Sequence, residues 1–407
     1  MPRLLSLNSY HYRRGGSDVV YFEHDAMFRR MGWDTAQMSM HHPKNIPSEW
    51  SEFFVDELEF GHEYGVGQKL AMASKVIYSF EGQRKLSALL DRFSADVAHV
   101  HCIYHHLSPS VLPVLKKRGI PVVLTAHDLK IACPAYKMLN DGGICEQCKG
   151  GKVWNVVRNR CLRGGLATSA LVALESGLHK MLGVYRNNLS RVVTPSRFYR
   201  QKLIEWGWPA DMLTYIPNYV DSNAYSPSYE AGSYFLFFGR LAVEKGIRTF
   251  IRAATRSGVK VRVVGTGPLE AELKAEAEGA DVEFLGYRSG SELWDLVRGS
   301  RAVVLPSEWY ENAPMSVLEA YACGKPVIGA DIGGIPEMIV PDVTGWLFPS
   351  GDVDRLAELL SRVSAMPAAT IAEYGRNARE LVARDFTQER YAREMVELYG
   401  GLGRLAA

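Results

Sequence analysis

The chain has almost no excess of charge of either sign. Its 47 lysines and arginines are balanced by 45 aspartates and glutamates, so the formal net charge is +2 at pH 7. A near-neutral chain has no global field that draws it to nucleic acid or to a membrane. Any anionic partner must therefore be held by a local basic patch, and we expect no nucleic-acid partner.

The chain also has no long hydrophobic run. Its start, MPRLLSLNSYHYRRGG, has one short apolar run before charge returns, which fits neither a signal peptide nor a spanning helix. The longest apolar stretch without charge elsewhere, residues 164–174, is about half of the length that a membrane span needs. We expect a cytoplasmic protein that is soluble or at most bound at the inner face of the membrane.

Cysteine is scarce, with six in 407 residues. In a reducing compartment such residues are thiols or metal ligands more often than disulfides. The chain also lacks internal repeats and low-complexity segments. These absences describe an ordinary globular protein with a few thiols that need an explanation.

Short runs rich in valine, leucine and isoleucine recur between amphipathic stretches along the whole chain. This pattern is typical of parallel strands that are buried on both faces and joined by crossover helices. A chain of 407 residues, 47% of them apolar, is long enough for two domains, so the sequence predicts an α/β protein. The expected strands are residues 3–8, 97–101, 121–127, 191–196, 234–240, 260–267, 282–286, 301–307 and 325–330.

Residues 216–233, IPNYVDSNAYSPSYEAGS, separate the two series of strands. They are rich in proline, serine and asparagine and lack periodicity, so we interpret them as a linker between two doubly wound domains. The expected domains are residues 1–215 and 234–385, and a final amphipathic helix over 386–407 packs back on one of them. Such domains bind ligands at the carboxyl ends of their strands, so the functional cleft should lie between the domains.

Two cations lie in GRLAVEKG, where the first strand of the second series ends. Arg240 follows Gly239, and Lys245 precedes the next helix, an arrangement that suits a diphosphate because charge pairing and free backbone N–H groups act together. A solvated turn is the alternative. The nearby VVGTGP turns through Gly265 and Gly267, which indicates either a plain tight turn or a close approach of the backbone to a ligand.

The most specific segment is residues 306–339, where seven residues separate Glu311 from Glu319. Glu311 lies in the loop after an expected strand, and Glu319 lies in a helix that begins near Pro314, so both can approach one ligand. The amides at Met315 and Ser316, in the first turn of that helix, should point into the cleft. A chance surface pair is the usual explanation of such spacing, but the strand-to-helix junction argues against it.

Through these segments the chain resembles the retaining GT-B glycosyltransferases of the E-x7-E type, a class of family 4-like enzymes. The matching pieces are Gly15-Gly16 before a helix that ends RRMGWD, then TAHD, VVTPSRF, GRLAVEKG, GTGP, FLGYRS, residues 306–339 and TGWLF, in the family's order. The resemblance implies a GT-B fold, in which two Rossmann-like domains face a central cleft. It also implies a nucleotide-diphosphate sugar as donor, UDP- or GDP-linked, transfer of a hexose with retention of configuration, and no catalytic metal.

The resemblance further implies roles for individual residues. Arg240 and Lys245 would neutralise the diphosphate as it leaves, and His127 would border the sugar near its reacting carbon. Glu311 would hold sugar hydroxyls, and Glu319 would hold the ribose. The implied catalytic set is His127, Glu311, Arg240 and Lys245, and the implied donor-binding set is Gly15, Gly16, Gly239, Arg240, Lys245, Gly265, Gly267, Tyr287, Asn312, Ala313, Met315, Ser316 and Glu319.

Four cysteines follow His127 closely. Cys133, Cys145, Cys148 and Cys161 contain one C-x2-C pair and could supply four thiolates to a structural zinc ion. Incidental buried thiols are the alternative, and an iron-sulfur cluster is a more distant one. Because this insertion, residues 129–165, leaves from the cleft edge of the first domain, we expect it to shape acceptor binding.

Residues 149–163 are basic and contain no acid. They carry Lys149, Lys152, Arg158, Arg160 and Arg163. Such a segment could meet an anionic lipid head group, a diphosphate-linked acceptor or nucleic acid, or it could be a solvated loop.

The histidines of HVHCIYHH, residues 99–106, lack acids and spaced cysteines beyond Cys102. We therefore interpret them as satisfied or cleft-lining side chains rather than as metal ligands.

We expect transfer of a hexose to a saccharide or lipid-linked saccharide during assembly of a surface polysaccharide, with contact to the membrane surface. One alternative keeps the fold and replaces the acceptor by a small soluble molecule. Another is a nucleotide-sugar-binding or zinc-dependent interaction protein without turnover.

Overall fold

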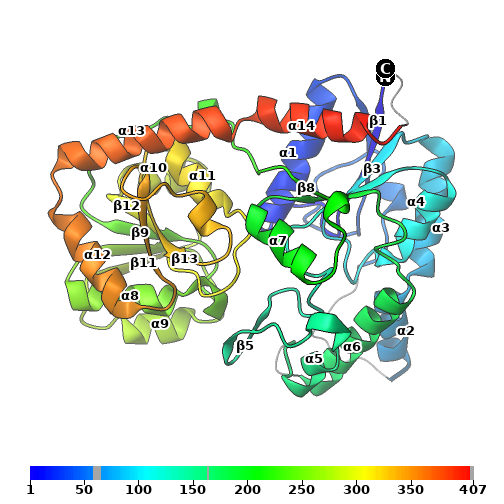
Figure 1. The fold of residues 1–407 in the computed structure, drawn as a ribbon, viewed down its shortest axis with the longest axis horizontal. Helices are drawn as coiled ribbons and strands as arrows, with labels where there is room; N and C mark the ends of the chain where they lie inside the picture. Colours follow the sequence, from blue (N-terminus) through cyan, green and yellow to red (C-terminus); the bar gives the residue numbers. More distant parts are fainter. Residues whose placement is uncertain (58–65, 163–164, 404–407) are drawn as a thin grey trace.

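The computed structural model describes residues 1–57, 66–162 and 165–403, the side chains of residues 66–71 excepted. Arg163 of the basic segment and residues 404–407 of the expected last helix lie outside the described residues. Figure 1 shows two lobes, each built around a twisted sheet with helices on both faces. We call them the N-terminal and the C-terminal domain.

The N-terminal domain contains a six-stranded sheet whose strands are all parallel. Its inner strands β1, β3, β4 and β7 pack as valine- and leucine-rich runs against helices on both faces, as the sequence predicts. In spatial order they are β2 (Asp34–Met38), β1 (Arg3–Leu7), β3 (Val97–Val100), β4 (Val122–Thr125), β7 (Arg191–Thr194) and β8 (Leu213–Tyr215).

The helices of this domain connect successive strands, and the cysteine insertion adds a short antiparallel hairpin and the short helix α5. The hairpin consists of β5 (Leu139–Asn140) and β6 (Gly143–Ile144). The helices are α1 (Gly16–Arg30), α2 (Val66–Ile77), α3 (Phe80–Arg92), α4 (Leu112–Lys117), α5 (Asn155–Arg158), α6 (Leu166–Met181) and α7 (Arg197–Glu205).

The C-terminal domain repeats this plan with a second parallel six-stranded sheet. Its spatial order is β11 (Val282–Gly286), β10 (Val261–Val264), β9 (Phe235–Phe238), β12 (Ala302–Leu305), β13 (Val327–Asp331) and β14 (Gly345–Pro349). Its helices are α8 (Ile247–Ser257), α9 (Glu270–Glu276), α10 (Gly290–Arg298), α11 (Met315–Ala322), α12 (Val353–Ala365) and α13 (Ala368–Asp385).

Short 3-10 turns complete both domains. They are η1 (Ser51–Phe53), η2 (Pro109–Val111), η3 (Lys149–Gly151), η4 (Ala210–Met212), η5 (Ser222–Ala224), η6 (Val243–Lys245) and η7 (Ile335–Glu337). Two parallel doubly wound domains confirm the predicted fold class.

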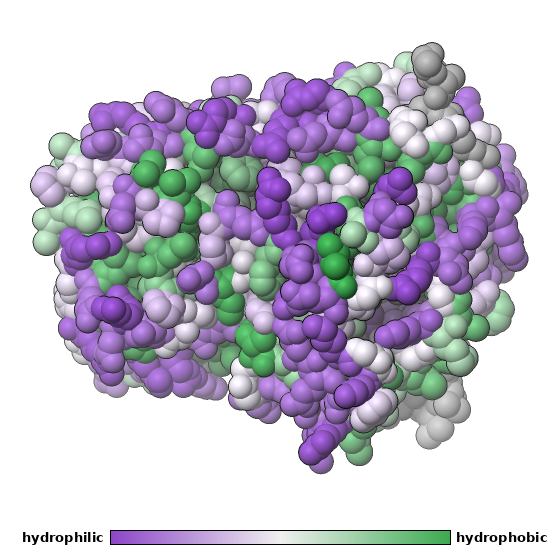
Figure 2. All heavy atoms as spheres, viewed as in Figure 1, coloured by the Kyte–Doolittle hydropathy of each residue, from purple (hydrophilic) through white to green (hydrophobic). Residues whose placement is uncertain are grey.

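The last helix returns to the N-terminal domain. Helix α14 (Gln388–Gly400) lies across that domain beside α1, and its Tyr391, Met395 and Tyr399 are buried against Leu4 and Phe28. In Figure 2 the outer sides of α13 and α14, along the upper edge of the view, are mostly hydrophilic, as expected for helices with one face on a core. Among the described residues, no helix is both long enough and apolar enough to span a membrane.

Candidate active site

The loops at the carboxyl ends of the two sheets touch each other. Asn312, in the loop after β12, donates its side-chain amide to the carbonyl oxygens of Ala126 (2.8 Å) and His127 (3.4 Å), which follow β4. Ser196 Oγ donates to Asn312 Oδ1 at 2.8 Å. Asn312 was expected to bind the donor, but its side chain already joins the two domains.

A second contact crosses the cleft at η7. The Glu337 carboxylate accepts the backbone N–H groups of Arg197 (2.8 Å) and Phe198 at the start of α7. A carboxylate at a helix N-terminus is favourable because the free N–H groups and the helix dipole both attract negative charge. These contacts hold the strand-end loops of both domains close together.

Lys245 and Glu311 form an ion pair at this junction. Lys245 Nζ donates to Glu311 Oε1 at 2.7 Å, and Ser307 Oγ donates to the same oxygen at 2.7 Å. Burial alone would raise the pKa of Glu311, but Lys245 and Ser307 hold it below its ordinary value. Glu311 is therefore a buried carboxylate anion fixed by a cation that still has two N–H groups to offer.

Glu319 lies in α11, as predicted, with a different environment. Burial raises its pKa to about 7, with no cation to oppose the shift. A protonated Glu319 can donate a hydrogen bond, and an ionised one can only accept. The two glutamates of the E-x7-E pattern thus differ in charge near neutral pH.

His127 is held by a second histidine. Its Nε2 is hydrogen-bonded to His101 Nδ1 at 2.8 Å, and burial lowers the pKa of His127 to about 4, so both rings are neutral. Among the described residues, His101 Nε2 is buried without a partner. An orphaned N–H is costlier than an orphaned lone pair, so the proton of His101 belongs on Nδ1 and is donated to His127. His127 then carries its own proton on Nδ1.

Two helix N-termini face each other at the same place. Gly15 is the N-cap of α1, and a side chain at Gly16 would lie 3.7 Å from Met315 Cγ at the start of α11. The first-turn N–H groups of a helix have no partner within the helix and attract anions. Gly15 and Gly16 leave this space open, and Met315 and Ser316 begin the opposite helix.

The other glycines expected at the donor site have a packing role. A Cβ on Gly265 would lie 1.9 Å from the carbonyl oxygen of Gly239, and one on Gly267 would lie 2.2 Å from that of Leu241. The loops after β9 and β10 are thus packed backbone against backbone. This close packing fits the plain tight turn that was one of the two interpretations of Gly265 and Gly267.

Three further residues of the expected donor set lie at this edge. Arg240 is exposed beside Gly239, and Tyr287 after β11 is 70% exposed. The carbonyl oxygen of Ala313 accepts from Asn218 of the linker at 3.0 Å.

The four cysteines are free thiols that gather within the insertion. Cys133 and Cys148 belong to the core of the N-terminal domain, and Cys161 packs against it. Burial, then the neighbouring thiols, raise the pKa of Cys148 to about 12 and that of Cys161 to about 11. Within the described part of the chain, no three cysteine, histidine or acidic side chains are arranged to hold a metal ion. Zinc binding stays a prediction.

The insertion contacts the C-terminal domain. Lys137 pairs with Glu244 at 3.2 Å, and Glu146, between the two cysteines of the C-x2-C pair, accepts from Tyr310 Oη at 2.9 Å and from Lys202 Nζ at 2.8 Å. Glu244 precedes Lys245 and Tyr310 precedes Glu311, so the insertion holds both loops that carry the central ion pair. The sequence analysis expected an acceptor role and missed these contacts.

Two Rossmann-like domains whose strand-end loops touch are the GT-B fold found in glycosyltransferases. The chain belongs to Glycosyltransferase Family 4, which matches residues 14–224, and residues 223–381 match Glycosyl transferases group 1. The predicted family and GT-B fold are confirmed.

Several known proteins are similar to this chain. The amylovoran biosynthesis glycosyltransferase AmsK of Erwinia amylovora is 29% identical over 221 residues, which cover 50% of this chain and 54% of AmsK. The alpha-maltose-1-phosphate synthase of Mycobacterium tuberculosis is 27% identical over 339 residues, 75% of this chain and 79% of the synthase. The chain spans about half the length of the first curated relatives it matches.

The fold is similar to that of Anabaena HepE, solved in complex with UDP and glucose. The TM-score is 0.68 at 19% identity, with 98% of this chain and 100% of the HepE chain covered.

Proposed function

We propose that this chain is a retaining glycosyltransferase that moves a hexose from a nucleotide-diphosphate sugar to a saccharide or lipid-linked saccharide during synthesis of a surface polysaccharide. One observation carries the proposal. His127, the Lys245–Glu311 pair and the N-termini of α1 and α11 meet where the strand-end loops of the two domains touch.

The diphosphate belongs between the two helix N-termini. Free N–H groups of α1 and α11 would donate hydrogen bonds to its oxygens, while Arg240 and Lys245 would supply positive charge. Charge builds on the diphosphate as the bond to the sugar breaks, so donors already in place lower the barrier. The Lys245 ammonium group can donate a hydrogen bond to the diphosphate, while its bond to Glu311 keeps that carboxylate ionised.

The sugar belongs beside Glu311 and His127. A buried carboxylate is a strong acceptor for sugar hydroxyls, and the Nδ1–H of neutral His127 is a donor for a sugar oxygen. Glu319, whose pKa is raised to about 7, would bond the ribose hydroxyls. With these residues on the donor, the acceptor would attack from the face of the leaving diphosphate, whose oxygen would take the acceptor's proton, and the configuration would be retained.

The names of the relatives support two kinds of acceptor, a polysaccharide and a small soluble molecule. AmsK is named for amylovoran biosynthesis, which supports a polysaccharide. The mycobacterial synthase is named for maltose 1-phosphate, which favours a small soluble acceptor as the second candidate. HepE was crystallised with UDP, which supports a nucleotide-diphosphate sugar without separating UDP from GDP.

Donor binding and slow donor hydrolysis test the proposal without knowledge of the acceptor. A panel of UDP-, GDP- and ADP-sugars is screened by thermal shift, because a ligand that binds the folded state raises the melting temperature. The donor that binds should then release free sugar and nucleotide diphosphate, and Glu311→Gln should abolish that release. Tight donor binding without release from any donor would instead identify a binding protein.

A further inference from the structure

The two faces of helix α6 have the opposite polarity to those of an ordinary surface helix. Its buried face is polar, and its exposed face is apolar. Its buried residues are Ser169, Val172, Glu175 and His179, of which three are polar. Glu175 is fully buried and accepts from Lys130 Nζ at 2.8 Å, and His179 Nε2 is hydrogen-bonded to the carbonyl oxygen of Ile77 at 2.7 Å. The inner face of α6 is therefore fixed by polar contacts.

The outer face of α6 is apolar. Leu166 is 57% exposed, Leu174 54% and Met181 74%, and Leu182 directly after the helix is 60% exposed. Leu166 and Leu174 are eight positions apart and Leu174 and Met181 are seven apart, about two helical turns each, so the three side chains lie on one side of α6. Ordinary surface helices place such a stripe on the core.

The apolar surface continues onto the neighbouring helix. Trp154, at the start of α5, is 60% exposed, and Val153 lies 3.7 Å from the position of a Cβ at Gly177 in α6. In Figure 1, α5 and α6 form the end of the N-terminal domain that is remote from α14. We call the outward side of both helices the α5–α6 face.

Basic side chains surround this face. Lys149, Lys152, Arg158 and Arg160 are exposed before α6, and Lys180 is exposed near its end. Lys180 Nζ lies 2.9 Å from the position of a Cβ at Gly151, so the two basic segments adjoin. Glu175 is the only acid between residues 149 and 182, and it is buried.

We propose that the α5–α6 face binds the surface of membranes that contain anionic phospholipids. An apolar stripe enters the boundary between head groups and acyl chains, and flanking lysines and arginines pair with the phosphates. Charge complementarity favours an anionic lipid surface over a second copy of the chain, whose own α5–α6 face would carry the same positive charge. This inference goes beyond the proposed transferase activity and does not depend on turnover.

Flotation with vesicles tests the apolar part. The full chain is mixed with vesicles of phosphatidylcholine alone or of phosphatidylcholine with phosphatidylglycerol. Binding to the anionic vesicles is expected, and Leu174→Ser with Met181→Ser should weaken it by about tenfold or more. The matched control is Val340→Ser with Val343→Ser, which removes exposed apolar side chains from the C-terminal domain and should leave binding unchanged.

A charge-reversal variant tests the basic part. Lys152→Glu with Lys180→Glu should also weaken binding by about tenfold and reduce its dependence on salt, while Lys117→Glu on α4 should not. Melting temperatures of all variants confirm that they fold. The proposal is wrong if the wild-type chain binds neither vesicle, if it binds both equally, or if it forms a dimer that Leu174→Ser with Met181→Ser dissolves. Donor hydrolysis on the same preparations separates this outcome from failure of the proposed function.

Discussion

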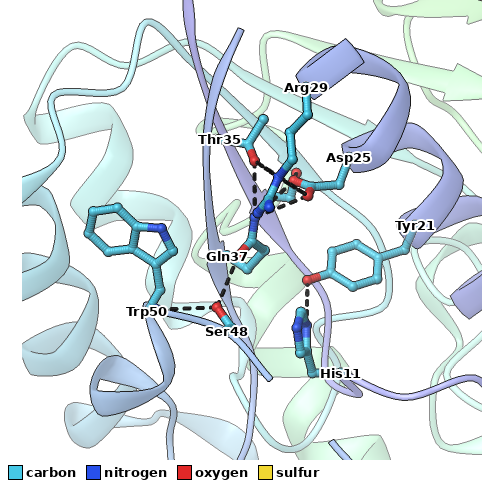
Figure 3. A network of polar contacts seen from close by, with 9 residues as sticks. His11, Tyr21, Asp25, Arg29, Thr35, Gln37, Ser48 and Trp50 are labelled. Carbon is cyan, nitrogen blue, oxygen red and sulfur yellow. Dashed lines mark hydrogen bonds and ion pairs between the residues drawn. The ribbon is translucent and has the colours of Figure 1, made fainter. Parts of the chain in front are cut away.

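All 11 histidines lie in the N-terminal domain, between His11 and His179, and the C-terminal domain has none. Among the described residues, His11, His24, His99, His101, His106 and His179 are buried there with other polar groups. Figure 3 shows one such network, in which Asp25 of α1 accepts from Gln37 of β2 at 3.1 Å and pairs with Arg29 at 3.1 Å. The core of the C-terminal domain consists instead of apolar side chains around its sheet.

The histidines also tie the last helix to the N-terminal core. His24 is hydrogen-bonded through Nδ1 to Tyr391 Oη (2.9 Å) and through Nε2 to Tyr399 Oη (3.0 Å), and Tyr399 Oη also contacts His99. Burial lowers the pKa of His24 to about 3, so it is neutral in the fold. The comparison teaches that buried polar contacts are spread through the core of the N-terminal domain, whereas in the C-terminal domain the buried charges, such as Glu311 and Lys325, lie outside its apolar core clusters.

Among the changes that test this difference between the domains, removal of a buried charge should have the largest effect on the free energy of unfolding. Glu175→Ala leaves Lys130, which is 3% exposed, without its anion and should lower the free energy of unfolding by about 3–5 kcal/mol. Urea unfolding followed by circular dichroism measures it. Glu358→Ala, which breaks the exposed pair with Arg355, is the control and should change little. Equal losses in both variants would contradict a special role of buried polar contacts.

Changing Glu311 should affect activity more than stability. Glu311→Gln keeps the shape and removes the charge that Lys245 pairs with, so we expect kcat to fall about a hundredfold or more. Steady-state donor hydrolysis measures this. An unchanged kcat would remove Glu311 from the reaction centre.

Acid should destabilise the N-terminal domain selectively. His24 has its pKa lowered to about 3 in the fold, so below about pH 6.5 the unfolded chain takes up a proton that the folded chain does not. Stability is therefore lost as the pH falls from 6.5 towards 3, by about 2 kcal/mol per such histidine at pH 5. Hydrogen exchange at pH 7 and pH 5 should show protection lost in the N-terminal domain first.

Through Glu319, the stability of the C-terminal domain should change with pH in the opposite direction. The pKa of Glu319 is raised to about 7, so its contribution to stability is full below about pH 4.5 and is lost as the pH rises through 7. Uniform loss of protection in both domains on acidification would contradict the comparison.

Weakening the insertion contacts should give a smaller effect. Lys137→Met with Glu146→Met removes partly exposed bonds to Glu244 and Tyr310, so we expect the donor KM to rise about threefold to tenfold with little change in melting temperature. Lys149→Met, which removes a looser pair with Glu205 on the N-terminal domain, is the control. A changed acceptor KM with an unchanged donor KM would instead restore the acceptor role expected from the sequence.

Metal analysis tests whether the four cysteines bind zinc. A zinc ion would favour thiolates, against the burial and the neighbouring thiols that raise the pKa of Cys148 to about 12, and we expect one zinc per chain in protein purified without chelators. Its removal should raise the donor KM as the insertion variant does. If the purified chain contains no zinc, and a chelator leaves its donor KM unchanged, then the cysteines are plain buried thiols.

The hairpin strands β5 and β6 were missed from the sequence, and the strands missed in the two large sheets are all at sheet edges. β2 and β8 flank the first sheet and β14 flanks the second, and none was expected. β2 reads DTAQM and β8 reads LTY, so they lack the apolar runs by which inner strands were recognised. β2 is nevertheless buried from Thr35 to Met38, because Thr35 and Gln37 bond to Asp25 of α1, and buried polar residues leave no apolar run in the sequence.

Residues of the site were predictable where they follow one strand or begin one helix. Lys245, Glu311 and Glu319 could be located in this way. His101, Glu146, Glu244 and Tyr310 could not, because their contacts depend on how distant segments meet, and a lone acid or tyrosine carries no signal of that.

The linker and the start of α14 have a mechanical consequence. Val220 N–H donates to the carbonyl oxygen of Phe386 at 3.1 Å, so the two places where the chain passes between domains are bonded to each other. Two adjoining passages define an axis: rotation about it strains neither, whereas sliding or twisting would stretch one of them. Rotation about this axis would change the separation of the loops after β4 and β12, which the side chain of Asn312 now joins.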